Sequence, residues 1–207
     1  MVEAFWVLFG IASLALIALP GQDMILVMSR SIAQGAKAGV VTAAGVSVGL
    51  VGHTVLATVG LGVILRTSEW LFLGLKLVGA AYLLYLGVGL LRTKRGGLTM
   101  EATESRPLGR LFLDGAFSNL SNPKIAVFYF AFLPQFVSPS AQHPTLTVFV
   151  LGLAFAGMTF LVKALVAMFS GALSAWLRFR PDVLIWVYRS SGAILVGLGV
   201  RLAFERR

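Results

Sequence analysis

The chain has 207 residues, of which 58% are hydrophobic and only 12% are charged, and it contains no cysteine. Soluble domains carry roughly 25% charged residues, so this composition excludes a protein that folds alone in water. The lack of cysteine excludes disulfides, thiolate metal sites and cysteine nucleophiles. The formal net charge of +9 requires no nucleic-acid partner, because the basic residues gather between apolar segments, as they do in membrane proteins.

Six apolar segments approach or exceed the ~20 residues that a helix needs to cross a bilayer. They cover residues 4–29, 38–64, 69–91, 111–137, 146–169 and 183–204. The first segment lacks the basic start of a secretory signal, so we expect it to be retained. The predicted fold is therefore all-α, an integral membrane domain over residues 1–207 with six transmembrane helices.

The first apolar segment is interrupted by Pro20, Gly21, Gln22 and Asp23. Proline lacks an N–H group and disrupts the preceding helical turn, and glycine adopts conformations that a helix does not use. A broken backbone and a carboxylate are both costly in hydrocarbon, so they persist where protein or a watery cavity surrounds them. We predict a helix break here, with Gln22 and Asp23 in a substrate- or proton-binding site. The alternative is a turn at the membrane surface, in which Asp23 caps the next helix.

Other ionisable residues also lie inside the predicted spans. His53 is in the middle of the second span, where it either relays protons or packs as a hydrogen-bonded histidine. Lys76 is about seven residues into the third span, so it either reaches the outer interface or pairs with Asp23. Lys163 and Arg189 lie nearer to span ends, and for both we favour a side chain that extends to the lipid surface.

The long polar connection at residues 93–105 is typical of a flexible linker. It divides the chain into halves at about 1–92 and 106–207, each with three predicted spans. A duplicated half with an odd number of spans inserts upside down, as in many secondary transporters, so we expect inverted halves with broken or re-entrant helices. More basic residues lie in connections on the same side of the membrane as the linker than on the opposite side. This distribution predicts a cytoplasmic linker and both termini outside. Arg201, Arg206 and Arg207 are exceptions, because they lie at the C-terminal end.

A second interruption contains Asn119, Asn122, Pro123 and Lys124. Asn122 suits the N-cap of a helix, and Pro123 suits the first helical position. The free N–H groups of such a helix start attract anions, so we predict that it binds a substrate carboxylate with help from Lys124. The alternative is a cap at the membrane interface, with Lys124 extended to lipid phosphate.

Three blocks of the sequence, in this order, carry a family resemblance. They are LPGQDMILVMSRSIAQGAKAGVVTAAGVSVG at residues 19–49, KLVGAAYLLYLGVGLLR from Lys76 to Arg92, and GAFSNLSNPKIAVFYFAFLPQF from Gly115 to Phe136. Together they resemble the LysE/RhtB family of amino-acid exporters. The resemblance implies that the important positions within these blocks are Pro20, Gly21, Asp23, Lys76, Gly79, Tyr82, Gly87, Asn119, Asn122, Pro123 and Lys124. The chain departs from many relatives at Gln22, where they have a second proline.

The resemblance implies a multi-pass exporter in the cytoplasmic membrane of a bacterium, with an amino acid or its derivative as the substrate and protons as the coupling ion. The implied partners are this small molecule, protons and the lipid bilayer, with no cofactor and no metal; a homo-oligomer is left open. An enzyme is not predicted, because it would need paired acids or metal-ligand spacing at depth. The alternative function is a transporter or channel for a metal or other small ion, although Asp23 alone is too few ligands for a hard cation.

Overall fold

The computed structural model describes residues 2–67, 69–93, 104–137 and 142–204, which contain helices and no strand. In chain order the helices are α1 (Val2–Ile17), α2 (Gln22–Gln34), α3 (Ala36–Thr67), α4 (Glu69–Leu91), α5 (Leu108–Leu120), α6 (Pro123–Phe132), the 3-10 helix η1 (Leu133–Phe136), α7 (Pro144–Phe179) and α8 (Pro181–Phe204). The prediction of an all-α protein is confirmed.

Among the described residues, three helices are long and apolar enough to cross a membrane. Their membrane-crossing parts are Ala36–Leu61 of α3, Pro144–Trp176 of α7 and Asp182–Phe204 of α8. α1 and α2 pass the same test as a pair, although the chain bends by 60° between them. Shorter apolar helices cover Lys76–Leu91 and Ile125–Phe136, within the third and fourth predicted spans. The structure thus supports a multi-pass helical membrane protein with three to four candidate spans.

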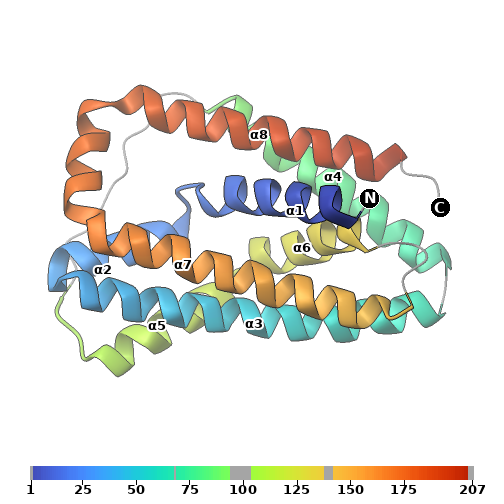
Figure 1. Cartoon of the computed structure of the whole chain (residues 1–207), viewed down its shortest axis with the longest axis horizontal. Helices are drawn as coiled ribbons and strands as arrows, with labels where there is room; N and C mark the ends of the chain where they lie inside the picture. The colour runs from blue at the N-terminus through green and yellow to red at the C-terminus, as the bar shows by residue number, and fades with distance from the viewer. Residues whose placement is uncertain (1, 68, 94–103, 138–141, 205–207) are drawn as a thin grey trace.

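Most of the helices lie along the long axis of the molecule (Figure 1). The start of α1 and the end of α8 lie at one end, and the end of α4 and the start of α5 lie at the other, which we call the linker end. α3 packs along both α5 and α7, and α4 packs along α8. In this view α1 and α6 occupy the space between these two groups.

Small residues allow these helices to approach closely. A Cβ atom on Gly45 of α3 would lie 2.0 Å from the carbonyl oxygen of Phe112 on α5, and one on Gly115 of α5 would lie 2.4 Å from the carbonyl oxygen of Thr42. Lipid offers no hydrophobic drive between helices, so close backbone contact and dispersion hold them together. The α3–α5 contact therefore depends on residues without side chains.

An aromatic cluster fills the interior between the two helix breaks and the end of the molecule that carries the start of α1. Phe9 of α1 lies 5.2 Å from Phe136 of η1, and Phe128 of α6 lies 4.8 Å from Phe132, measured between ring centroids. Phe155 of α7 packs against both Phe128 and Phe132. All five rings are buried, so they form a packed cluster that joins α1, α6, η1 and α7.

Candidate functional site

The break between α1 and α2 is enclosed in part by α8. The Tyr188 hydroxyl donates a hydrogen bond of 3.2 Å to the Pro20 carbonyl oxygen, and the Ser191 hydroxyl donates one of 2.7 Å to the Ala15 carbonyl oxygen. These bonds satisfy carbonyl groups that the interrupted helix leaves without intrahelical donors, as burial in a membrane protein requires. Gly21 itself is exposed, and its extended backbone forms the N-cap of α2.

Asp23 and Asn119 bring the two interruptions of the sequence together. Asn119 Nδ2 donates a hydrogen bond of 2.6 Å to Asp23 Oδ2. Asp23 lies in the first turn of α2 and is 8% exposed, and Asn119 lies in the last turn of α5 and is fully buried. The N-cap of α2 is Gly21, with no side-chain capping bond, so the Asp23 carboxylate faces α5 instead of capping its own helix.

The same pair offers two further acceptors. Asp23 Oδ1 and Asn119 Oδ1 are buried, and neither has a hydrogen-bond partner in the part of the chain that the structure describes. Buried polar atoms are nearly always hydrogen-bonded in folded proteins. An amide oxygen and an ionised carboxylate oxygen accept and do not donate, so the group that would complete them is a donor, such as an ammonium.

His53 supports Asn119 from α3. His53 Nε2 lies 3.1 Å from the Asn119 carbonyl oxygen, and because a carbonyl only accepts, Nε2 is the protonated nitrogen in this contact. The imidazole is 3% exposed and packs against the ring of Tyr129 at 5.9 Å. One turn earlier, a Cβ atom on Gly49 would lie 2.8 Å from Asn119 Cβ. The structure therefore places His53 in a packed, hydrogen-bonded setting, and its role in proton transfer stays a prediction.

The other residues predicted for the site are placed less centrally. Gln22 is exposed, and its Nε2 donates a hydrogen bond of 3.4 Å to the Ser118 hydroxyl on α5. The Asn122 carbonyl accepts bonds of 3.1 and 3.3 Å from the N–H groups of Ile125 and Ala126, so Asn122 occupies the N-terminal boundary of α6. Lys76 is half-buried on α4, which packs chiefly along α8 and α6.

Pro123 is the first residue of α6, as expected for proline at a helix start. The side chain of Lys124 lies outside the described part of the structure.

Lys163 was interpreted as a lipid-facing residue, and that interpretation is wrong. Lys163 is buried at 6% exposure, on a helix that packs against α3 and α2. The error comes from the end of the fifth predicted span, which was placed at residue 169, whereas α7 continues to Phe179. Residue 163 therefore lies well inside the helix. The sequence signal for its burial was that Lys163 is the single lysine in a long apolar run.

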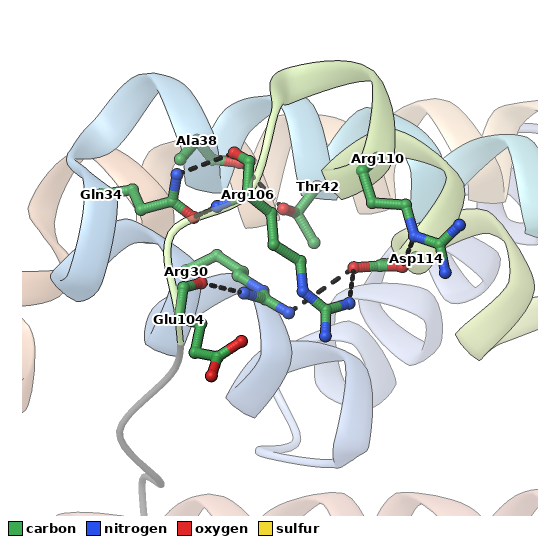
Figure 2. A network of polar contacts seen from close by, with 8 residues as sticks. All are labelled: Arg30, Gln34, Ala38, Thr42, Glu104, Arg106, Arg110 and Asp114. Carbon is green, nitrogen blue, oxygen red and sulfur yellow. Dashed lines mark hydrogen bonds and ion pairs between the residues drawn. The ribbon is translucent and has the colours of Figure 1, made fainter.

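A charge network at the linker end joins α2, α5 and the end of the linker (Figure 2). The Arg30 guanidinium, buried at 5% exposure, lies 3.5 Å from Asp114 Oδ2 and donates a 2.9 Å hydrogen bond to the Glu104 carbonyl oxygen. Arg106 and Arg110 approach the same carboxylate at 2.8 and 3.3 Å. Arg30 adjoins the first predicted connection, where basic residues are expected for topological reasons alone, so this network was not predicted.

Gln34 anchors the end of the linker to α2. Its Nε2 donates a 2.9 Å hydrogen bond to the Arg106 carbonyl oxygen, and its Oε1 accepts a 3.0 Å bond from the Arg106 N–H. The Gln34 side-chain amide thus both donates to and accepts from the backbone of Arg106. This fixes residues 104–107, where the linker joins α5, beside α2.

The chain matches known proteins along nearly its whole length. It is 34% identical over 210 residues to a homoserine/homoserine lactone efflux protein of Salmonella typhimurium, covering all of this chain and 99% of that protein. It is 32% identical over 204 residues to an uncharacterized membrane protein of Pseudomonas aeruginosa, covering 96% of this chain and 94% of that protein. No solved structure matches it. Residues 14–206 match the family described as LysE type translocator, and the chain therefore belongs to that family.

Proposed function

We propose that this protein exports an amino acid or a close derivative across the cytoplasmic membrane by proton antiport. Membership of a translocator family supports transport and not enzymatic conversion. The efflux relatives are named for homoserine and its lactone, which are small molecules with a primary ammonium. The observation that carries the proposal is the Asn119–Asp23 hydrogen bond of 2.6 Å at the meeting point of two helix breaks.

The proposed transport cycle requires six passes, in which α1–α2 and α5–α6 each form one interrupted pass. The halves 1–92 and 106–207 are then inverted copies, with both termini outside and the linker in the cytoplasm. Two features support this arrangement. α3 packs on α7 and α4 packs on α8, so helices in equivalent positions of the two halves face each other. The interruptions follow helices of 16 and 13 residues that start from opposite ends, as an inverted repeat requires.

In this proposal the substrate ammonium binds between Asp23 Oδ1 and Asn119 Oδ1. A primary ammonium has three N–H donors, and a charge-assisted bond to a carboxylate is roughly twice as strong as a neutral one. Both acceptors are buried and lack partners among the described residues. His53 and Gly49 keep Asn119 in position from behind, so the ammonium site is preorganised.

Proton coupling follows from competition at one carboxylate. Asp23 binds either a proton or the substrate ammonium, so loading one releases the other. The aromatic cluster lies on one side of this pair, and the Arg30–Asp114 network lies on the other. Alternating access then consists of opening one of these two barriers at a time.

The substrate is tested in cells that either carry or lack this chain. Each strain is loaded with dipeptides of one amino acid, homoserine included, and the free amino acid inside the cells is measured after intracellular hydrolysis. We expect homoserine or another small amino acid to accumulate severalfold more in cells that lack the chain. Equal accumulation of every amino acid in the two strains would reject the exporter proposal.

A further inference from the structure

Lys163 is a buried cation that ammonium binding at Asp23 does not use. It lies on α7 at 6% exposure, in the interior of a protein that crosses the membrane. Charged side chains at such depth are costly and mark functional sites more often than packing. Asp23 lies on α2, which packs against α7, so one acidic and one basic side chain are buried on adjoining helices.

The register of α2 against α7 places Asp23 and Lys163 about 6 Å apart along the helix axes. The Ser31 hydroxyl donates a hydrogen bond to the Ala167 carbonyl oxygen, and both helices run toward the linker end (Figure 1). Asp23 lies eight residues before Ser31, about 12 Å along the axis, and Lys163 lies four residues before Ala167, about 6 Å. Helical side chains tilt toward the N-terminus, so the long lysine side chain covers much of the difference and extends toward the level of Asp23.

We propose that Lys163 binds the carboxylate of the substrate and makes the site select a free amino acid over derivatives that lack a carboxylate. This inference rests on the proposed function. A zwitterion placed between Asp23 and Lys163 replaces the attraction between these two side chains with two contacts. Its ammonium binds Asp23, and its carboxylate binds Lys163. A lactone or amide keeps the ammonium that binds Asp23 but leaves Lys163 buried, charged and beside a second cation, which is unfavourable.

This assignment differs from the carboxylate site predicted at the start of α6. That prediction depended on Asn122 and Lys124, at the N-terminal boundary of a helix. The Lys163 assignment depends on a buried basic side chain on α7, which packs against the helix that carries Asp23. The two assignments differ in which lysine controls discrimination against a blocked carboxylate, so they can be separated by experiment.

The test uses the full chain in proteoliposomes, with initial efflux rates of homoserine and of its lactone measured below saturation. We expect Lys163→Met, which removes the charge and keeps an unbranched side chain, to lower homoserine efflux about tenfold or more, the factor that corresponds to losing one strong polar contact. Lactone efflux should stay within about twofold of wild type. Lys163→Arg should retain part of the preference for homoserine, and Lys124→Met should leave the ratio unchanged.

If Lys163→Met leaves the ratio of homoserine efflux to lactone efflux unchanged, whether or not both rates fall, the proposed role of Lys163 is overturned. The exporter proposal is then still intact. If Lys124→Met abolishes the preference instead, the carboxylate binds at α6. Efflux of neither compound by wild type would overturn the proposed function itself. If Lys163→Met does not fold, competition on the wild-type protein decides: homoserine amide should inhibit homoserine efflux about tenfold more weakly than the free acid does, and equal inhibition would overturn the assignment.

Discussion

The Arg30 guanidinium and the Asp114 carboxylate lie 3.5 Å apart and join α2 to α5 near the linker end. The same two helices are joined again by Asp23 and Asn119. Arg30 lies seven residues after Asp23, about 10 Å along α2, and Asp114 lies five residues before Asn119, about 7.5 Å along α5. α2 and α5 each pack chiefly on α3, so these two polar pairs are important links between them.

Asp114→Asn should destabilise the protein because it leaves the buried Arg30 without a full counter-charge. The loss of charge-assisted contacts predicts a decrease of about 2 kcal/mol in the free energy of unfolding. Thermal unfolding of the purified protein in detergent measures this. Arg110→Gln is the matched control, because the Arg110 side chain is 66% exposed and exposed ion pairs contribute little. Equal melting temperatures for Asp114→Asn and wild type would contradict the prediction.

Gly45→Ala should prevent normal packing of α3 on α5. The added Cβ would lie 2.0 Å from the backbone carbonyl oxygen of Phe112, and backbone cannot give way as a flexible side chain can. We expect most of the protein to elute as aggregate in size-exclusion chromatography. Gly157→Ala, also within a long helix but with open space around it among the described residues, should stabilise α7 by up to about 1 kcal/mol. A monodisperse Gly45→Ala protein with wild-type yield would show that α3 and α5 are less tightly packed.

Gly35→Ala should weaken the junction between α2 and α3. Gly35 has φ of 87° and ψ of 165°, a region that is essentially restricted to glycine and costs other residues about 1–3 kcal/mol. Gly21→Ala is the matched control, because Gly21 has φ of −111° and a Cβ atom added there would have no described atom within 4 Å beyond its chain neighbours. Thermal unfolding should therefore separate the two variants, with Gly35→Ala the less stable. The reverse order would contradict the backbone assignment.

The sequence predicted the helix break because the energetic cost of its residues is local. Pro20 and Gly21 interrupt a helix wherever they occur, and the structure places a break there; Asn119 and Asp23 stood out because polar groups are expensive in an apolar segment. Their contact depends on how α5 lies beside α2, which composition and periodicity do not encode. Lys163 was missed because apolar length does not fix where a helix ends, and α7 continues beyond the expected span.

The charge network was missed for a related reason. Arg30 lies next to a predicted connection, where basic residues are common for topological reasons. Its burial arises only because the chain returns at residues 104–114 to supply a carbonyl group and a carboxylate. The pairing joins residues 74 and 84 positions apart, so no local pattern predicts it. A single sequence therefore identified polar groups that cost free energy to bury, but not the residues that hydrogen-bond or pair with them.

Asp23→Asn should abolish proton-coupled export while preserving the fold. Asparagine has nearly the same shape as aspartate, and its side-chain oxygen still accepts the hydrogen bond from Asn119 Nδ2. It carries no charge, so it neither binds a proton reversibly nor offers a carboxylate to the substrate ammonium. In proteoliposomes with an imposed pH gradient, homoserine efflux should fall to the rate of empty liposomes, although the protein elutes as wild type does. Gln22→Ala, at the neighbouring exposed position, should retain gradient-driven efflux within a few-fold, because its amide contributes a single long hydrogen bond to Ser118. Efflux by Asp23→Asn at the wild-type rate would show that the coupling proton binds elsewhere.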